Sequence, residues 1–309
     1  MATIRPTTWI ESARLSDRLG CQVVIASETF QHTGSFKFRA AYNVAANVPN
    51  PRIITASSGN FGQALAYACK LLGKGCTVVM PHNSVAVKVD AVRSYGATVD
   101  LVNTVEMSRA GRVQQLSDEQ PDAYVASAYD DPLVIEGNSS LGTEIAARGG
   151  IDCVIAPVGG GGLTSGIAMG LQRKGYGIEL FGAEPLMAND AARSLREGRI
   201  VTNEQEPQSI ADGARTVSLG EHNWAVLKES LAGVVEVPEA NIRDGVRLLF
   251  QLANLKSEPT GALAIGALLT DPGRFSGRRV CCVISGGNAD PAAYAELIAG
   301  DSGFPPKRE

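Results

Sequence analysis

Four consecutive glycines, Gly159–Gly162, follow the apolar run Cys153–Val158 and precede a predicted helix. A strand, a glycine loop and a helix start can form an anion cradle, because several backbone N–H groups converge without side chains in the way. The dinucleotide fingerprint Gly-x-Gly-x-x-Gly fails here, since its last position falls on Thr164 or Ser165. The loop also lacks the lysine of a nucleotide P-loop. The pattern favours a single monoester phosphate, with a structural turn as the alternative.

Lys37 is the candidate for covalent chemistry with a carbonyl compound. It lies in the segment Thr33–Arg39, at the start of a predicted helix, with Phe36 and Phe38 on either side. Aromatic neighbours that exclude water disfavour the ammonium form and lower the pKa of a lysine. A lysine with a lowered pKa is suited to Schiff-base formation. The competing interpretation is an ordinary lysine whose aliphatic stem packs on apolar side chains.

Two further loops place neutral polar groups at the ends of predicted strands. Ser57–Asn60 and Ser285–Asn288 each follow a short apolar run. Hydroxyl and N–H groups at a helix start can bind a carboxylate, and ligands of open α/β sheets bind at the carboxyl ends of the strands. The alternatives are helix capping by Ser57 or Ser58 and, for the second loop, a plain turn.

The elements that must position these loops alternate along the chain. Short runs rich in β-branched residues predict strands at 22–27, 52–56, 77–80, 98–102, 124–126, 153–158, 178–183, 234–237 and 280–284. Helical patterns between them predict helices at 36–48, 59–72, 85–94, 107–118, 132–148, 163–174, 241–255, 261–269 and 291–298. The alternation predicts βαβ units and a mostly parallel sheet, and the continuous apolar strands predict that helices cover both of its faces.

Composition narrows the class of protein. The chain has 309 residues, of which 44% are hydrophobic and 19% charged, with a net charge of −4. The hydrophobic content excludes a disordered chain, and the slight acidic excess argues against a nucleic-acid partner. No apolar stretch approaches the roughly 20 residues of a membrane span, and Met1–Ser12 lacks the apolar segment of a secretory signal. We expect a cytoplasmic protein that acts on a small molecule and has no membrane partner.

The six cysteines show neither a metal-binding nor a Cys-x-x-Cys spacing. Cys281 and Cys282 are neighbours in a predicted strand, where successive side chains point to opposite faces. We expect all six to be reduced and to act as small hydrophobic residues.

Together, these pieces resemble the fold type II enzymes that depend on pyridoxal phosphate, the tryptophan synthase β-like group. Within it, the chain is similar to serine/threonine dehydratases and serine racemases. The segments that carry the resemblance, in chain order, are Thr33–Arg39, Ser57–Asn60, Gly159–Gly162, Gly182–Pro185, Ile210–Gly213, Glu258–Thr260 and Ser285–Asn288. The resemblance implies an α/β fold with two open, twisted, mostly parallel sheets and the cofactor in the cleft between two domains. The large domain would comprise residues 1–50 and 131–309, and the small domain residues 51–130.

The resemblance also implies how the cofactor is held. Lys37 would carry pyridoxal 5′-phosphate covalently and act as the base at the substrate Cα. Phe36 would pack beside the ring, and Asn60 would bond its 3-hydroxyl group. Gly159–Gly162 would hold the phosphate, and Ser285 would face the pyridine nitrogen.

For the substrate, the resemblance implies that Ser57, Ser58, Gly59 and Asn60 receive the carboxylate. In racemases the position matching Ser58 also exchanges a proton on the opposite face of the substrate. Phe61 departs from the family pattern, which often has histidine there. This change removes a polar group beside the carboxylate pocket.

The family also carries a divalent-cation site, whose pattern here falls on Glu184, the backbone carbonyl of Ala188, and Asp190. Hard oxygen ligands of this kind suit Mg²⁺ or Ca²⁺. The alternative is that Asn189 or Asp190 simply caps a helix over Ala191–Arg196.

Ser285 favours one reaction over others. A neutral hydroxyl cannot keep the pyridine nitrogen protonated as an aspartate would, so the ring is a weaker electron sink. Loss of a β-substituent together with the Cα proton avoids a long-lived carbanion. We therefore expect an ammonia-lyase that eliminates water from threonine or serine, the default substrates, with 3-hydroxyaspartate as a further candidate, and releases a 2-keto acid and ammonia.

Three other functions remain open from the sequence. They are an amino-acid racemase with dehydratase side activity, a β-replacement synthase, and a non-catalytic small-molecule-binding protein on the same scaffold. The family further implies a homodimer.

Overall fold

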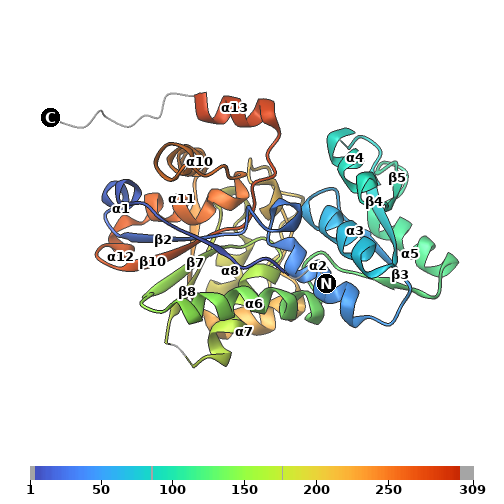
Figure 1. Ribbon diagram of the computed structural model, residues 1–309, viewed down its shortest axis with the longest axis horizontal. Coiled ribbons are helices and arrows are strands. Elements are labelled where there is room, and N and C mark those ends of the chain that lie inside the picture. The colour runs from blue at the N-terminus through green and yellow to red at the C-terminus, as the bar shows by residue number, and fades with distance from the viewer. Residues whose placement is uncertain (1–3, 85, 176, 300–309) are drawn as a thin grey trace.

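The computed structural model describes residues 4–84, 86–175 and 177–299, and its strands form two sheets (Figure 1). The six-stranded sheet has the order β1-β2-β10-β7-β8-β9 and the four-stranded sheet the order β5-β4-β3-β6. The strands are β1 (Thr8–Glu11), β2 (Gln22–Ser27), β3 (Arg52–Ala56), β4 (Gly75–Pro81), β5 (Thr98–Val102), β6 (Ala123–Val125), β7 (Cys153–Pro157), β8 (Glu179–Pro185), β9 (Leu231–Val237) and β10 (Arg279–Ile284). Within the described residues every strand pair except β1–β2 is parallel. The predicted α/β fold with two mostly parallel sheets is confirmed.

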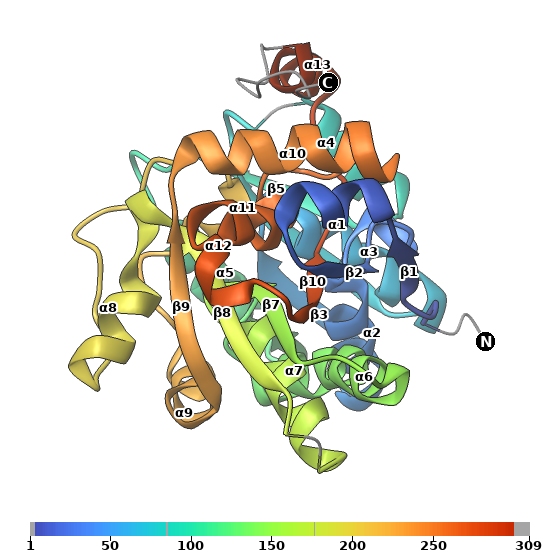
Figure 2. The same ribbon diagram turned by 90° about the vertical axis from the view of Figure 1, so that its left-hand side faces the viewer.

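Helices cover both faces of the larger sheet, as Figure 2 shows for α1, α10 and α11 on one side and α6 and α7 on the other. The helices are α1 (Ala13–Leu19), α2 (Lys37–Asn47), α3 (Asn60–Leu72), α4 (Ala86–Ser94), α5 (Arg109–Glu119), α6 (Pro132–Arg148), α7 (Gly162–Arg173), α8 (Asp190–Glu197), α9 (Glu221–Ser230), α10 (Glu239–Ala253), α11 (Leu263–Thr270), α12 (Pro272–Phe275) and α13 (Pro291–Ala299). The helix predicted at 85–94 includes position 85, which lies outside the described residues. No helix in the described ranges is both long and apolar enough to cross a membrane.

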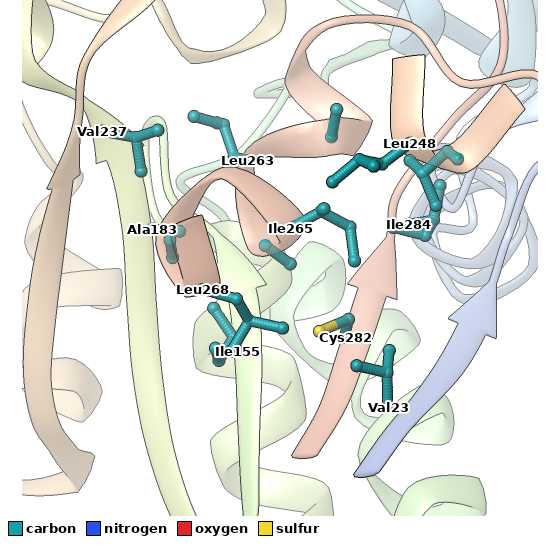
Figure 3. Close-up of a cluster of buried hydrophobic side chains, with 14 of the residues drawn as sticks. Val23, Ile155, Ala183, Val237, Leu248, Leu263, Ile265, Leu268, Cys282 and Ile284 are labelled. Atoms are coloured by element: carbon teal, nitrogen blue, oxygen red, sulfur yellow. The ribbon is translucent and has the colours of Figure 1, made fainter. Parts of the chain in front are cut away.

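The main core lies between the strands of the larger sheet and helices α10 and α11 (Figure 3). Val23 and Ile155 face Leu263 and Ile265 there, and all four side chains are buried. Cys282 points into the same core, whereas its neighbour Cys281 packs on the opposite face with the side chains of α6 and α7. The prediction of opposite faces is confirmed, and all six cysteines are free and buried.

The order of the strands brings distant segments of the chain together. β10 lies between β2 and β7 in parallel register, so the loops that follow these three strands meet at one edge. The N–H of Phe36 donates to the carbonyl of Ser285 (2.9 Å), and the N–H of Glu28 donates to that of Ile284 (2.9 Å). In the smaller sheet β3 and β6 are neighbours in the same way, which places the Ser57 loop near the segment that follows β6.

Candidate active site

One pocket gathers most of the residues that the sequence singled out. It is lined by Phe36, Lys37, Asn60, Tyr129, Pro157, Gly159, Gly160, Gly161, Gly162, Leu163, Gly213, Glu258, Thr260 and Ser285. Asn60 begins the helix that follows β3 of the smaller sheet, whereas the glycine loop and Ser285 follow strands of the larger one. The predicted cofactor residues therefore lie in one place, where segments from both sheets meet.

Lys37 is the first residue of α2, and its amine is buried in the pocket. Nζ donates a hydrogen bond to the carbonyl of Ala128 (2.7 Å) and lies 5.0 Å from the ring centroid of Phe36 and 5.7 Å from that of Phe61. Burial lowers the pKa of Lys37 to about 8, although the charge of Glu258 opposes the shift. A sizeable fraction of this amine is therefore neutral, and nucleophilic, near physiological pH.

The aromatic surroundings of Lys37 differ from the prediction in one residue. Phe38 does not flank the amine; its ring packs against His32, Tyr42 and Tyr67, within the buried cluster that also includes Phe61. Successive residues of a helix point about 100° apart, so a neighbour in sequence turns to another face. Phe61, which the sequence suggested only as a departure from the family, supplies the second ring instead.

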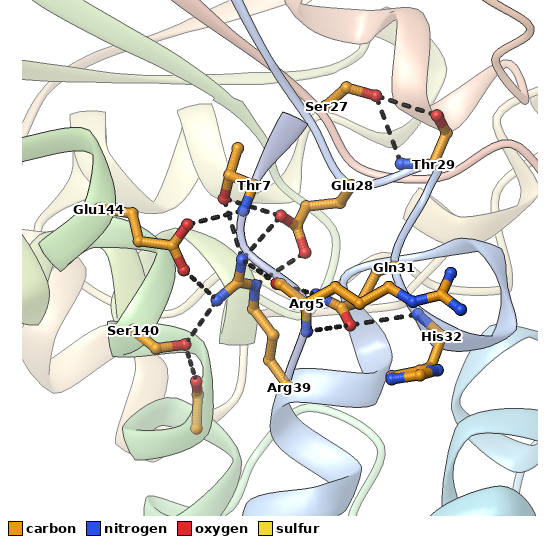
Figure 4. A network of polar contacts seen from close by, with 11 residues as sticks. Arg5, Thr7, Ser27, Glu28, Thr29, Gln31, His32, Arg39, Ser140 and Glu144 are labelled. Carbon is orange, nitrogen blue, oxygen red and sulfur yellow. Dashed lines mark hydrogen bonds and ion pairs between the residues drawn. The ribbon is translucent and has the colours of Figure 1, made fainter. Parts of the chain in front are cut away.

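An ionic network fixes the helix that carries Lys37 (Figure 4). Arg39 and Glu28 both have fully buried side chains, and Arg39 Nε donates to Glu28 Oε2 (2.7 Å). The same guanidinium reaches Glu144 Oε1 (2.7 Å) on α6 and Thr7 Oγ1 (2.9 Å). Segments from three distant parts of the chain are thus tied to α2 close to the reactive amine.

The glycine loop has no room for side chains. A Cβ added at Gly160 would lie 2.1 Å from Cδ2 of the Tyr129 ring, and one at Gly162 would lie 2.7 Å from the Tyr129 carbonyl. Gly161 adopts a positive φ of 98°, which glycine tolerates best. Asn223 fixes the loop from behind by donating from Nδ2 to the Gly160 carbonyl (2.8 Å). The bare backbone at the start of α7 has the form of a phosphate cradle.

We expect Gly160→Ala to weaken the binding of pyridoxal phosphate at least about tenfold, because the new methyl group must displace Tyr129 or distort the loop. The measurement is an absorbance titration of cofactor-free protein with pyridoxal phosphate, alongside a thermal melt. Gly273→Ala is the matched control, since a Cβ there meets nothing within 4 Å. Unchanged affinity in the Gly160 variant would remove this loop from the cofactor site.

In the Ser57–Asn60 loop, one serine hydroxyl supports the helix and another is available to a ligand. Ser57 Oγ accepts the N–H groups of Gly62 (3.1 Å) and Gly59 (3.4 Å) and so caps the start of α3, the alternative weighed for this residue. Ser58 is half-buried, and its hydroxyl has no hydrogen bond among the described residues. Ser58 is thus the hydroxyl of this loop that remains available to a ligand.

Asn60 joins this loop to the other side of the pocket. Its Nδ2 donates to Glu258 Oε1 (2.8 Å), and its Oδ1 accepts from Asn288 Nδ2 (2.9 Å). Ser285 lies across the pocket, only 2% exposed, and its side chain has no hydrogen bond within the described part of the chain. A hydroxyl on the pocket wall without a protein partner is suited to receive a polar ligand atom.

Tyr129 and Glu258 line the pocket, but the sequence assigned neither of them a role in the site. Glu258 lay in a segment matched to the family, which was the available signal. For Tyr129, the local pattern that could have drawn attention to it is the Asp130-Asp131 pair that follows it and precedes a predicted helix. Asp130 accepts the N–H groups of Glu221 (3.0 Å) and His222 (3.0 Å) at the start of α9, which holds the preceding tyrosine over the glycine loop.

The proposed cation ligands lie together beside β8. Both oxygens of Glu184 accept backbone N–H groups, from Ala192 (2.7 Å) and Ala191 (3.1 Å), so Glu184 caps α8. Asn189, considered for that cap, instead donates to Glu236 (2.6 Å). Burial raises the pKa of Asp190 to about 6, and its Oδ2 is buried without a partner. Both Glu184 oxygens are thus taken by backbone N–H groups, which leaves Asp190 Oδ2 as the free carboxylate oxygen, and the described residues contain no group of three His, Cys, Asp or Glu side chains that could hold a metal ion.

The site fits the expected cofactor on three independent features: a buried amine of lowered pKa, a side-chain-free loop at a helix start, and a hydroxyl on the pocket wall without a partner among the described residues. Fold and site together fit an α/β enzyme that uses an aldehyde cofactor. The chain belongs to the pyridoxal-phosphate dependent enzyme family, whose model matches residues 1–286. The predicted family, fold type and cofactor are confirmed.

Similar proteins agree with this class. The chain is 35% identical over 307 residues to the L-threo-3-hydroxyaspartate ammonia-lyase of Saccharomyces cerevisiae, covering 98% of this chain and 94% of that one. It is 30% identical to the serine racemase of Schizosaccharomyces pombe, covering 95% and 92%. Among solved structures, the processed form of threonine deaminase isoform 2 from Solanum lycopersicum superposes with a TM-score of 0.89 at 30% identity, covering 96% and 88%. The predicted reaction class, that of a pyridoxal-phosphate-dependent lyase, is confirmed.

Proposed function

We propose that the chain is an ammonia-lyase that eliminates water from a small β-hydroxy amino acid, with 3-hydroxyaspartate as the first candidate and threonine and serine as the others. The observation that carries the proposal is Ser285, a neutral hydroxyl in the pocket where stabilisation of a long-lived carbanion would call for a carboxylate. The 35% identity to an L-threo-3-hydroxyaspartate ammonia-lyase supports the choice of first candidate.

Different residues of the site have separate roles in this reaction. When bound, the cofactor supplies a sink for the electron pair that is left at Cα. Lys37 Nζ, released when the substrate amine takes its place on the cofactor, accepts the Cα proton and passes it to the departing β-hydroxyl group, which leaves as water. The N–H groups of the glycine loop hold the phosphate, and the Ser58 hydroxyl receives the substrate carboxylate. Phe61, only 1% exposed, excludes water beside the amine.

The substrate test is a coupled assay for keto acid and chirality over the stereoisomers of serine, threonine and 3-hydroxyaspartate, with and without Mg²⁺. We expect keto acid and ammonia in equal amounts, with the largest kcat/KM for one isomer of 3-hydroxyaspartate. Silence across the whole panel would favour a non-catalytic binding protein. A thiol product after addition of sulfide would favour the β-replacement synthase.

Ser58→Ala separates the lyase from the racemase. Loss of the hydroxyl is expected to abolish any racemisation, which needs a proton donor on the second face, and to leave elimination within about tenfold of the wild type. The measurement is the rate of appearance of the opposite enantiomer beside the rate of keto-acid release. Ser57→Ala is the control, since Ser57 caps α3 and its loss should lower thermal stability instead. Racemisation that survives in Ser58→Ala would contradict the assignment.

The proposal has four further parts: the domain division, a cation site, a homodimer and a cytoplasmic location. The division into residues 1–50 plus 131–309 and residues 51–130 is supported by the smaller sheet, whose four strands fall between Arg52 and Val125. A Mg²⁺ or Ca²⁺ site at Glu184, Ala188 and Asp190 is supported by the unpartnered Asp190 oxygen, and chelation should lower thermal stability. The homodimer stays a prediction, which light scattering can test. The cytoplasmic location also stays a prediction.

A further inference from the structure

Glu258 is a buried carboxylate that the reaction described above does not use. It is 6% exposed and lines the same pocket as Lys37. Its Oε1 accepts the amide hydrogen of Asn60 (2.8 Å), and the space for that oxygen exists because residue 286 is glycine: a Cβ there would lie 2.5 Å away. The absence of a side chain at Gly286 thus leaves the space in which the Glu258 carboxylate contacts Asn60.

Glu258 decides which way the Asn60 amide faces. An ionised carboxylate can only accept hydrogen bonds, so the Asn60 NH₂ group must point towards it. Asn288, itself donating to the Thr33 carbonyl (2.7 Å), completes the arrangement by donating to Asn60 Oδ1. One N–H of the amide is occupied by Glu258, and the second remains available to a ligand oxygen.

The charge on Glu258 depends on groups from several elements. Lys37 faces it from α2, Asp212 from the turn Asp212–Ala214, and Lys88 from α4. Burial and the charge of Asp212 raise the pKa of Glu258 to about 8, while the bond from Asn60, the charge of Lys88 and the N–H of Asn288 oppose the shift. Lys88 and Asp212 are themselves an ion pair (3.2 Å) at the surface.

We propose that Glu258 is a positioning residue, which in its ionised form holds the Asn60 amide in the orientation that serves the cofactor and balances the charge of Lys37. The inference rests on the proposed function for the contact between Asn60 and the cofactor. It predicts that kcat/KM and the absorption of the bound cofactor both change with the ionisation of Glu258. As pH rises through the pKa of Glu258, kcat/KM should increase.

The first test compares Glu258→Gln with the wild type in the holoenzyme, with the exposed Glu229→Gln as a matched control. The glutamine can keep the bond to Asn60 but cannot ionise. We expect kcat/KM to rise through about pH 8 in the wild type, and the absorption of the lysine-bound cofactor to change with the same midpoint. In Glu258→Gln both transitions should vanish, and kcat/KM at high pH should fall about tenfold. Glu258→Asp, which keeps the charge, should retain the transition.

The second test moves the transition without touching Glu258. Asp212→Asn removes a negative charge that raises its pKa, so the midpoint of both profiles should shift to lower pH. Lys88→Met removes a positive charge that lowers it, so the midpoint should shift to higher pH. Opposite shifts from the two halves of one exposed ion pair are not expected if Glu258 serves only to support the fold.

The outcomes separate the inference from the proposed function. A wild-type protein that binds no pyridoxal phosphate at Lys37 would overturn the proposed function. Bound cofactor and normal turnover, with the same midpoint in Glu258→Gln as in the wild type, would overturn only the role of Glu258. Shifts in the same direction for Asp212→Asn and Lys88→Met would overturn it as well, even if Glu258→Gln does not fold.

Discussion

Replacement of Lys37 by alanine is expected to lower keto-acid release by about 10³-fold or more, because the same amine both carries the cofactor and moves the Cα proton. The amine is buried and 2.7 Å from the Ala128 carbonyl, so neither water nor an exposed lysine can easily take its place. The decisive measurement is reduction with borohydride followed by mapping of tryptic peptides. The wild type should carry a reduced pyridoxyl group at position 37, and the variant should carry none there.

The exposed Lys228→Ala is the matched control for charge and side-chain loss. It should keep both the adduct at position 37 and the rate. A wild-type adduct on another lysine, or full turnover in the alanine variant, would disprove the central assignment of the site. Lys37→Arg should be as inactive as the alanine variant, since a guanidinium stays protonated and forms no imine under these conditions.

The second large effect concerns stability. Arg39→Met should lower the free energy of unfolding by about 3–5 kcal/mol, because it leaves Glu28 without its cation in a dry interior. Both side chains are fully buried, and the guanidinium also serves Glu144 and Thr7. Urea unfolding followed by circular dichroism measures the change. Since α2 begins with Lys37, the melting temperature should fall together with cofactor affinity.

Arg52→Met provides the comparison, because the Arg52–Asp122 ion pair is about half exposed on both sides. Its loss should cost less than about 1 kcal/mol. The double variant Arg39→Met, Glu28→Gln should recover part of the lost stability, since it no longer buries an unpaired charge. An Arg39 variant as stable as Arg52→Met would show that the network does not hold α2.

Local sequence patterns predicted the parts of the site that depend on one segment at a time. The glycine loop, the lysine at a helix start and the polar loops after β3 and β10 were each recognisable, because strand, turn and helix signals lie next to each other in the chain. Their convergence also followed, since the carboxyl ends of parallel strands share an edge.

Contacts between distant segments could not be predicted in this way. Asn60 and Glu258 are 198 positions apart, and Lys37 and Ala128 are 91 apart. No local pattern shows that Phe61 rather than Phe38 flanks the amine, or that Ser57 is used to cap α3. The short β1 and α1 were missed because four and seven residues carry too little periodicity to stand out.

The position of β10 between β2 and β7 also has a consequence for how the protein is made. During synthesis the smaller sheet is complete once Val125 has left the ribosome, whereas the centre of the larger sheet must wait for Ile284. Until then β2 and β7 have open edges where their shared neighbour will insert, and such edges invite pairing with other chains. Nascent chains are therefore most exposed to misassembly just before the last central strand emerges, and cofactor capture must follow that step.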